Sequence, residues 1–429
     1  MSEGTVSPLG LTAELTSTVD GAAGGHDGEF GVIGPATGRV FAMAPETTPE
    51  ALDAAVAAAD RTFRTEWRTD DDVRRGALGA LAETLADSAD DLAALLSAEQ
   101  GKSLPDALDE VAVAARYAQY YAENPAEREA LGPIAVITPW SFPLSIAFAS
   151  IAPALRSGGT VVWKPSPHAP LSALMAGELL RLVLPPGVLN VVSGSDPLGA
   201  RLVAHPLVRE VGFTGSVATG KKVVAAADTK RLTLDLSGND PVLVLDDADP
   251  GRVAGEVFAA AFRNLGQVCV GPKRVYVPAS LQQAFVEALT ELARTAEHAE
   301  LAPVGTRQQF DRIVDLVADA RAHRAVVTAC GSQLDRPGYF AAPAILADVT
   351  DGVRVVDEDQ FGPVLPVITY TDVDDAIKAA NASPYRLGAS VFGADPGRAA
   401  AVAGRLEAGA VWIGSHGTHP PEDPGRSAG

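Results

Sequence analysis

From Ile134 onward, the sequence alternates between short β-branched runs and longer runs with helical periodicity. The strand-like runs of the first series span residues 134–138, 160–164, 188–192, 210–213 and 231–236. A second alternating series extends from Val242 to Trp412. Alternation of this kind is typical of βαβ units around a parallel sheet. We therefore expect an α/β fold with two parallel-sheet domains in tandem, preceded by helices that begin near Pro49.

Composition narrows the class of protein. The chain has 429 residues, 47% of them hydrophobic, which is enough for two substantial cores. A net charge of −20 argues against nucleic acid or an anionic membrane surface as a partner. There is no signal-peptide pattern, no apolar run of roughly 20 residues and no metal-binding motif. Because two cysteines give no disulfide framework, we expect a cytoplasmic, soluble protein without a metal site.

One of the two cysteines, Cys269, ends the stretch FRNLGQVC. A helical run over Pro250–Phe262 leads into this stretch, and a strand-like run over Lys273–Val277 follows it. A thiol on a glycine-containing turn between a helix and a strand can face a cleft, where backbone N–H groups lower its pKa and bind an oxyanion. The alternative is a buried structural cysteine, which is common for this residue type.

Three turns of the first series carry candidate binding residues. They read TPWSFP after the first strand, WKPSP after the second and FTGS after the fourth. Turns at the carboxyl ends of parallel strands are where ligands bind. Gly215 and Ser216 lead into a helix N-terminus, which suits a pyrophosphate, and Lys164 is placed to reach a ribose or phosphate. A GxGxxG fingerprint is missing, so an ordinary Rossmann motif is not present.

In their order and spacing, these segments resemble the aldehyde dehydrogenase superfamily over Gly34–Ile413. The matching segments are TPWSFP (138–143), KPSP (164–167), PPGVLNVV (185–192), FTGS (213–216), LDLSGNDP (234–241), FRNLGQVC (262–269), QFGPV (360–364) and the stretch from Asn381 to Leu387-Gly388. The resemblance implies a Rossmann-like cofactor domain, a catalytic domain and a small oligomerisation domain. It also implies NAD(P)-dependent oxidation of an aldehyde to a carboxylate through a cysteine thiohemiacetal and thioester.

On this resemblance we expect four segments along the chain. They are a loose N-terminal tail over 1–30, a dinucleotide-binding domain over 31–235, a catalytic domain over 236–413 and an irregular tail over 414–429. The tail histidines His416 and His419 are expected to be solvated, and Cys330 to be a core thiol.

The family's residue roles carry over to matching positions. Cys269 is the implied nucleophile, Asp235 the implied general base and Ser141 the implied oxyanion donor together with the Cys269 N–H. The implied cofactor-binding residues are Thr138, Pro139, Trp140, Lys164, Ser166, Phe213, Thr214, Gly215, Ser216, Gly220, Asp359 and Phe361. Arg263 matches an arginine that binds the distal carboxylate in succinate-semialdehyde dehydrogenases, although its companion arginine falls on Ala149.

Four positions depart from the family. Ser141 replaces an asparagine, while Asp235 and Asp359 each replace a glutamate and so lose one methylene. Pro167 replaces the glutamate that binds the adenine ribose, which removes a charge that would oppose a 2′-phosphate. We therefore expect NAD or NADP as the cofactor, with NADP used at least comparably to NAD.

Two further departures concern assembly. The run 124–133 fills the place of a β-hairpin oligomerisation arm, and the chain ends where the family has a strand that crosses to a partner subunit. We expect a monomer or a weak homodimer, the latter through the helix near Gly220–Ala227.

Other functions remain open from the sequence. One is a catalytically weak family member that binds a dinucleotide or a partner protein, which the changes at Ser141, Asp235 and Asp359 favour. Others are a semialdehyde dehydrogenase, which Arg263 favours, and a coenzyme A-acylating enzyme. Relatives of the acylating kind lack the base carboxylate, so Asp235 argues against that possibility.

Overall fold

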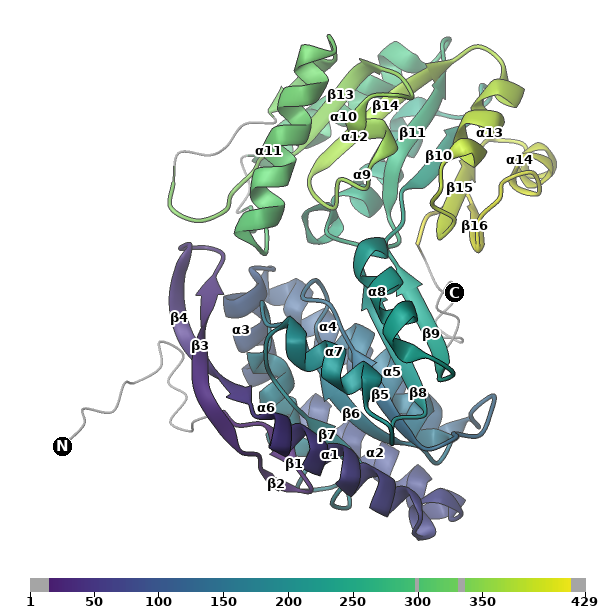
Figure 1. Cartoon of the computed structure of the whole chain (residues 1–429). Coiled ribbons are helices and arrows are strands. Elements are labelled where there is room, and N and C mark those ends of the chain that lie inside the picture. Colours follow the sequence, from purple (N-terminus) through teal and green to yellow (C-terminus); the bar gives the residue numbers. More distant parts are fainter. Residues whose placement is uncertain (1–14, 298–300, 331–335, 418–429) are drawn as a thin grey trace. The chain divides into compact units, whose positions relative to one another are not determined.

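The computed structural model describes residues 15–297, 301–330 and 336–417 (Figure 1). The chain divides into two compact units with a boundary between Leu236 and Ser237, and each unit is built around its own seven-stranded sheet. Both sheets are mostly parallel and interleaved with helices, which confirms the α/β expectation.

The first unit contains the elements β1 to β9. Its strands are β1 (Thr18–Val19), β2 (Ala22–Ala23), β3 (His26–Gly34), β4 (Arg39–Thr47), β5 (Pro133–Ile137), β6 (Thr160–Lys164), β7 (Leu189–Val191), β8 (Glu210–Gly215) and β9 (Arg231–Leu236). Its helices are α1 (Pro49–Phe63), η1 (Glu66–Arg68), α2 (Asp71–Asp87), α3 (Ala89–Gln100), α4 (Leu104–Glu123), α5 (Ser145–Arg156), α6 (Leu171–Leu180), α7 (Asp196–Ala204) and α8 (Val217–Ala227).

The sheet of the first unit has the strand order β2-β1-β7-β6-β5-β8-β9. Strands β7, β6, β5, β8 and β9 run parallel, and β1 pairs antiparallel with β7. The chain starts the parallel part at β5, proceeds outward to β7 and then returns to β8 on the other side. A topological switch point therefore lies between β5 and β8, where a doubly wound sheet binds its ligand.

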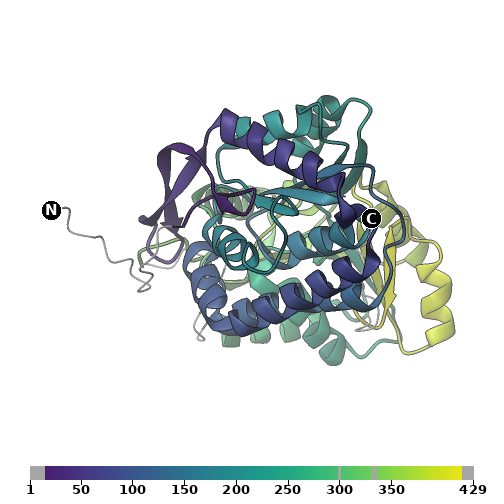
Figure 2. The same ribbon diagram turned by 90° about the horizontal axis from the view of Figure 1, so that it is seen from below.

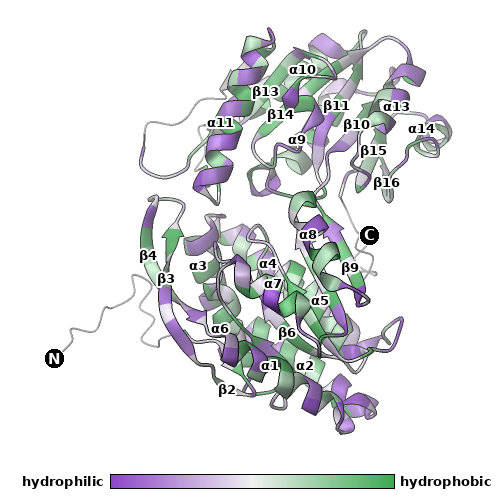
Figure 3. Cartoon of the chain, viewed as in Figure 1, coloured by the Kyte–Doolittle hydropathy of each residue, from purple (hydrophilic) through white to green (hydrophobic). Residues whose placement is uncertain are grey.

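Successive residues of β5 and β6 contact different helix layers, because side chains alternate across a sheet. Ala135 and Val162 pack with α1, α7 and α8, whereas Val136 and Val161 pack with α2 to α6. Figure 2 shows α1 in purple and the blue helices on opposite sides of the strands. The hydropathy colouring of Figure 3 shows apolar strands and helices whose outward faces are hydrophilic, as an α/β layer arrangement requires.

The N-terminal expectation was wrong for the residues that the structure describes. Residues 18–34 contain β1, β2 and the whole of β3, and β3 pairs antiparallel with β4 in a separate two-stranded sheet. Ser17 is buried, and its hydroxyl lies 2.7 Å from the Thr47 hydroxyl. The missed signal was glycine, because Gly21 and Gly28 have positive φ and so permit the turns and irregularities between short strands.

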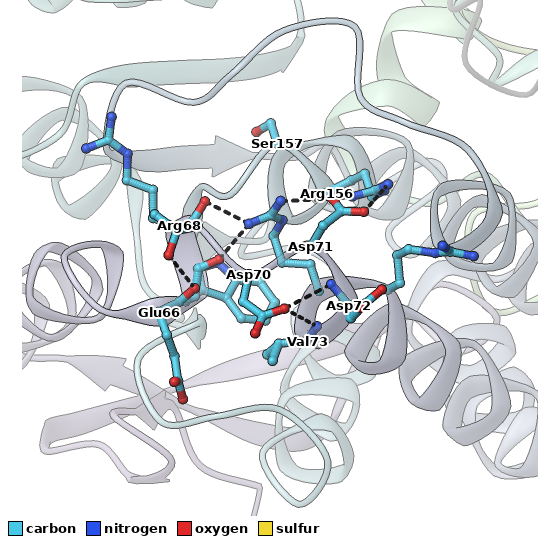
Figure 4. Close-up of polar contacts among 12 residues, drawn as sticks. Glu66, Arg68, Asp70, Asp71, Asp72, Val73, Arg156 and Ser157 are labelled. Atoms are coloured by element: carbon cyan, nitrogen blue, oxygen red, sulfur yellow. Dashed lines mark hydrogen bonds and ion pairs between the residues drawn. The ribbon is translucent and has the colours of Figure 1, made fainter.

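A carboxylate at the start of α2 fixes the C-terminal end of α5 (Figure 4). Asp70 caps α2 by accepting from the N–H groups of Asp72 and Val73, at 3.0 and 3.1 Å. The next carboxylate, Asp71, accepts two hydrogen bonds from the guanidinium of Arg156 and one from Arg74. The Arg156 bonds hold the pKa of Asp71 below its usual range. This pairing anchors the helix whose N-terminal end follows the TPWSFP loop.

The segment between α4 and β5 contains no strand. Its residues instead lie beside β8 and β9 of the same unit. The Leu131 N–H donates to Glu210 at 2.7 Å, and Arg231 of β9 donates to the Glu129 carbonyl at 3.2 Å. Side chains of its own unit therefore hold this segment by forming hydrogen bonds with its backbone N–H and carbonyl groups.

The second unit contains the elements β10 to β16. Its strands are β10 (Asp240–Val244), β11 (Pro272–Pro278), β12 (Val326–Cys330), β13 (Ala344–Val349), β14 (Val364–Tyr370), β15 (Gly388–Phe392) and β16 (Ala410–Ile413). Its helices are α9 (Pro250–Ala261), η2 (Arg263–Gly266), α10 (Gln282–Glu297), α11 (Arg307–Ala322), α12 (Arg354–Asp357), α13 (Val373–Ala382) and α14 (Pro396–Ala403).

The second sheet has the order β12-β13-β14-β11-β10-β15-β16, and all its pairs are parallel except β12 with β13. Alternation again separates two cores. Leu243 of β10 packs with α11, α13 and α14, whereas Val242 and Val244 pack with α9 and α10. Among the residues that the structure describes, no helix is long and apolar enough to cross a membrane.

Candidate active site

In the first unit, the expected binding residues lie at the carboxyl ends of four neighbouring strands. Thr138 follows β5, Lys164 ends β6, and Asp235 lies near the end of β9. The FTGS residues 213–216 end β8 and begin α8. Strand register fixes their order, because Ile137 pairs with both Lys164 and Phe213, and Thr214 pairs with Asp235. The sheet thus brings Thr138, Pro139, Trp140, Ser141, Lys164, Ser166, Phe213, Thr214, Gly215, Ser216 and Asp235 to one edge.

The loop after β5 is held by two buried charges that the sequence analysis did not single out. The Lys102 ammonium donates to the Ser141 carbonyl at 3.0 Å and makes an ion pair with Glu110, with both side chains 1% exposed. Glu110 also accepts from the N–H groups of Leu144 and Ser145 at the start of α5, at 2.8 and 3.2 Å. The sequence signal that could have indicated this ion pair was a lysine and a glutamate eight positions apart, on either side of a helix start. Ser141 itself is buried.

Lys164 is buried, and its Nζ lies 3.2 Å from the Pro165 carbonyl. Burial lowers the pKa of Lys164 to about 8, and the negative charges of Asp196 and Glu46 act in the opposite direction. These two acidic residues, at the start of α7 and near the end of β4, were not identified from the sequence. They restore negative charge near Lys164 that the change to Pro167 had removed.

The N-terminus of α8 follows β8 directly. The Ser216 hydroxyl caps it by accepting from the Thr219 N–H at 3.2 Å. One turn later, a Cβ on Gly220 would lie 2.5 Å from Leu236 Cδ2, so a glycine lets α8 pack closely on β9. Unbonded N–H groups at such a terminus bind phosphate oxygens.

Asp235 is half-buried, and its negative charge acts on Tyr117 of α4. Burial raises the pKa of Asp235 above its ordinary value. Burial also raises the pKa of Tyr117, and the negative charge of Asp235 adds to that shift. Tyr117 packs against the first core and also lies within electrostatic range of Asp235.

In the second unit, Cys269 follows a turn of unusual backbone conformation. Asn264, Leu265 and Gly266 have φ values of 47°, 53° and 71°, in the left-handed region. The Asn264 Nδ2 donates to the Gln267 carbonyl at 3.3 Å, and Gln267 Nε2 donates back to the Asn264 carbonyl at 2.9 Å. A left-handed conformation costs free energy for residues other than glycine, so this turn is maintained by its surroundings.

The glycine of this turn has no room for a side chain. A Cβ on Gly266 would lie 2.3 Å from the Gly362 carbonyl oxygen. The Cys269 carbonyl, in turn, lies 2.9 Å from where a Gly238 Cβ would be. The Cys269 side chain is half-buried, so its thiol is partly accessible, which suits a nucleophile better than a core cysteine. The QFGPV, FRNLGQVC and LSGND segments therefore converge around the cysteine.

Asp359 and Phe361 form a second strained position in this unit. Phe361 has a φ of 46°, and its N–H donates to Asp359 at 3.0 Å. Seven non-glycine residues of the described chain have positive φ, and three of them are Asn264, Leu265 and Phe361. Concentrated strain of this kind is typical of functional sites. Burial raises the pKa of Asp359 to about 6, and the nearby Lys273 charge opposes that shift.

The functional segments of this unit precede strands instead of following them. LSGND leads into β10, Cys269 precedes β11 by three positions, QFGP leads into β14, and Leu387 precedes β15. The sheet thus gathers Cys269, Asp359 and Phe361 at its amino edge. Arg263 is exposed at the start of η2, six positions before the cysteine.

The expectation for His416 was wrong. His416 is buried and not solvated: its Nδ1 lies 2.9 Å from the Ser390 hydroxyl, and its Nε2 lies 3.4 Å from Asp240. Its ring also packs against Trp412, with centroids 5.1 Å apart. The proline and glycine content suggested an irregular tail, but Gly414 and Gly417 turn the chain back after β16, with φ values of 71° and 65°. His419 and the Cys330 side chain lie outside the described residues.

No metal-binding cluster is present in the described ranges. No group of three or more His, Cys, Asp or Glu side chains there is placed to hold an ion.

Comparisons with known proteins support the family resemblance of these segments. Residues 23–425 match the model of the aldehyde dehydrogenase family. A betaine aldehyde dehydrogenase of Brucella anthropi is 35% identical over 426 residues, covering 92% of this chain and 87% of the relative. The chloroplastic betaine aldehyde dehydrogenase of Beta vulgaris is 34% identical over 421 residues, covering 89% and 84%.

Solved structures show the same architecture. An aldehyde dehydrogenase from Bacillus cereus superimposes with a TM-score of 0.91 at 30% identity, covering 98% of this chain and 92% of that one. An indole-3-acetaldehyde dehydrogenase from P. syringae, in complex with NAD+ and IAA, has a TM-score of 0.91 at 28% identity, covering 95% and 90%. The chain belongs to the aldehyde dehydrogenase family and is an NAD(P)-dependent oxidoreductase that converts aldehydes to carboxylic acids.

Proposed function

We propose that Cys269 is the nucleophile of this aldehyde oxidation. The observation that carries the proposal is the locked left-handed turn over 264–266, which holds a half-exposed thiol at the amino edge of the second sheet. The thiolate would add to the aldehyde carbon to give a thiohemiacetal, and loss of hydride would leave a thioester. The Cys269 N–H and the Ser141 hydroxyl are the proposed donors to the oxyanion.

We propose that the dinucleotide binds at the carboxyl edge of the first sheet. The N-terminus of α8, with Gly215 and Ser216, fits a pyrophosphate, and the Lys164 ammonium fits a ribose or phosphate. Thr138, Pro139, Trp140, Ser166, Phe213, Thr214 and Gly220 complete the proposed site. Asp359 and Phe361 are proposed to contact the nicotinamide ribose. When bound, NAD(P)+ supplies the hydride acceptor.

We propose that Asp235 is the general base of thioester hydrolysis. Its carboxylate would take a proton from water as the water attacks the thioester carbon, and Cys269 would leave as thiolate. Support comes from its half-buried position at the end of β9 and its raised pKa, which brings a carboxylate closer to the range useful for a base.

We propose that the enzyme discriminates only weakly between NAD and NADP. Pro167 provides no carboxylate for the adenine ribose, but Asp196 and Glu46 act on Lys164 with negative charge. The two effects oppose each other, so both NAD and NADP would be used.

For the substrate, we propose an aldehyde with a distal carboxylate. Arg263 is exposed and six positions before the nucleophile, and a guanidinium there would attract an anionic group and repel a quaternary ammonium. This differs from the betaine aldehyde named for two of the relatives. We further propose a cytoplasmic monomer or weak homodimer, because the 124–132 segment forms no strand and is held by Glu210 and Arg231 of its own unit.

A substrate panel tests this function. Succinate semialdehyde, betaine aldehyde and hexanal are each supplied with NAD or NADP, with and without coenzyme A, while NAD(P)H absorbance is followed. We expect turnover without coenzyme A, with the anionic aldehyde giving the highest kcat/KM. Strict dependence on coenzyme A would indicate an acylating enzyme, and no turnover with any aldehyde would indicate a binding protein. A preference for betaine aldehyde would contradict the role given to Arg263.

A further inference from the structure

Lys273, four positions after Cys269, is among the largest fully buried side chains of the molecule. It is the second residue of β11, and its side chain is 2% exposed. A lysine is seldom buried to this extent without a partner, because removing an ammonium from water costs several kcal/mol. Neither the family resemblance nor the proposed mechanism gives this charge a role.

The ammonium lies among the strained segments of the site. Its Nζ donates at 2.5 Å to the carbonyl of Gly266. Gly266 is the last left-handed residue of the turn before Cys269. It lies 3.9 Å from the Asp359 carboxylate and 5.5 Å from the centroid of the Phe361 ring. One side chain therefore links the nucleophile's turn to the two residues proposed to contact the nicotinamide ribose.

The charged groups around this lysine can be named from each element that packs against it. Asp359 precedes β14, Asp240 begins β10, and the Cys269 sulfur lies on the turn before β11, and each of them interacts electrostatically with Lys273. Arg312 of α11 donates to the Asp359 carbonyl at 3.1 Å and so adds positive charge on the far side of that residue.

Burial acts on both members of the close pair. It lowers the pKa of Lys273 and raises that of Asp359, and the attraction between the two opposes both shifts. A thiolate that interacts with this ammonium would be stabilised for the same reason, since a nearby opposite charge favours the charged form of a group.

We propose that Lys273 is a positioning residue for Cys269, whose ammonium both holds the Gly266 carbonyl and stabilises the thiolate, in competition with Asp359 for the same charge. The thiol proton passes to solvent, and no group changes its oxidation state. This inference rests on the proposed role of Cys269 as the nucleophile. It adds the source of the positive charge that the thiolate requires.

The test measures the thiol directly, without turnover. Alkylation of Cys269 by iodoacetamide is followed as a function of pH by mass spectrometry of the Cys269 peptide, which separates it from Cys330. In Lys273→Met the pH midpoint should rise by at least about one unit. In Asp359→Asn it should fall, because the ammonium no longer shares its charge with a carboxylate. Lys378→Met, at an exposed lysine of α13, is the matched control and should leave the midpoint unchanged.

A role confined to holding the turn would lower the melting temperature of both variants without moving their midpoints in opposite directions, and that result would overturn the proposal. If Lys273→Met does not fold, the double variant Lys273→Met/Asp359→Asn removes both buried charges together. The pH midpoint of the double variant should lie above that of Asp359→Asn alone, and a midpoint equal to that of Asp359→Asn would refute the proposal. Failure here is distinct from failure of the proposed function, which would appear as retained turnover in Cys269→Ala.

Discussion

The proposed functional residues lie at the carboxyl edge of the first sheet and at the amino edge of the second. In the first unit the TPWSFP, KPSP and FTGS segments lie at the carboxyl ends of strands, whereas in the second unit LSGND, the Cys269 turn and QFGP lead into strands. Helices begin at the carboxyl edge of a parallel sheet, so their N–H groups and positive dipole ends suit a pyrophosphate. At the amino edge helices end, and this source of positive charge is missing. The second sheet instead carries a buried ammonium, Lys273, which interacts electrostatically with Cys269, the proposed nucleophile.

This contrast predicts that substitutions at the amino edge affect chemistry while leaving cofactor affinity largely intact. The largest effect is expected for Cys269→Ala, because no covalent adduct can form. Aldehyde oxidation should fall by about 10⁴-fold or more. Titration of NADPH fluorescence should give a dissociation constant within about threefold of the parent enzyme, since an alanine leaves the phosphate site unchanged. Cys330→Ala is the control and should retain turnover. Undiminished oxidation in Cys269→Ala would remove the second sheet from the mechanism.

Asp235 belongs to the first sheet, yet we assign it a chemical step, so it tests how far the contrast extends. Asp235→Asn should slow thioester hydrolysis by about 10²–10⁴-fold and spare hydride transfer. Rapid mixing should then show a stoichiometric NAD(P)H burst followed by a slow steady state. Because burial raises the pKa of Asp235, the acidic limb of the parent kcat profile should lie above the ordinary aspartate range. Equal loss of burst and steady state would assign Asp235 to cofactor binding.

The carboxyl edge should respond in the opposite way. Lys164→Met should raise the KM for the dinucleotide by about tenfold, through loss of a charged hydrogen bond, with little change in kcat. The effect should be larger for NADP than for NAD, since a 2′-phosphate carries more charge. Lys222→Met, at an exposed lysine of α8, serves as the control. A loss of kcat at unchanged KM would place Lys164 in the chemistry and weaken the division between the two edges.

Buried charges of the first unit serve its helices, and they should affect stability more than activity. Glu99 is fully buried and accepts from the N–H groups of Leu171 and Ser172 at the start of α6, at 2.6 and 2.9 Å. Burial raises its pKa to about 7. A group whose folded pKa exceeds its unfolded value stabilises the fold below the unfolded pKa and loses that contribution as pH rises through the folded pKa. The free energy of unfolding should therefore decrease by about 3 kcal/mol between about pH 4.5 and 7.

Urea unfolding across this range provides the measurement. Glu99→Gln should flatten the pH dependence, whereas the exposed Glu83→Gln on α2 should preserve it. An unchanged slope in Glu99→Gln would show that another group titrates. At a pH where the variant is folded, its kcat should stay within about threefold of the parent value, as expected for a distant, independent site.

Local patterning predicted most of the fold. The five strand-like runs of the first series match β5 to β9, because buried parallel strands are continuous apolar runs that end at glycine and proline. The short strands at 18–34 and the buried His416 were missed. Both depend on glycine turns and on partners far along the chain, such as Asp240 for His416. Sequence patterns carry little information about contacts of that range.

For the candidate site too, some residues could be predicted from the sequence and others could not. Motif segments gave Cys269 and Asp235, since each lies within a continuous stretch whose composition is specific. Lys102, Glu110 and Lys273 were not recognised as part of the site, although they lie close to motif residues. A charged residue in an apolar run is ordinarily assigned to a solvated face. The structure connects them to motif residues through the hydrogen bonds from Lys102 to Ser141 and from Lys273 to Gly266.

Trapping the acyl-enzyme tests the central claim most directly. Asp235→Asn is mixed with NAD+ and succinate semialdehyde, quenched in acid during the slow phase, digested and analysed by mass spectrometry. We predict one succinyl group per subunit, in thioester linkage on the peptide that contains Cys269 and labile to hydroxylamine. The same NADH burst with the acyl group on another residue, or with no covalent adduct, would contradict covalent catalysis by Cys269 at the amino edge of the second sheet.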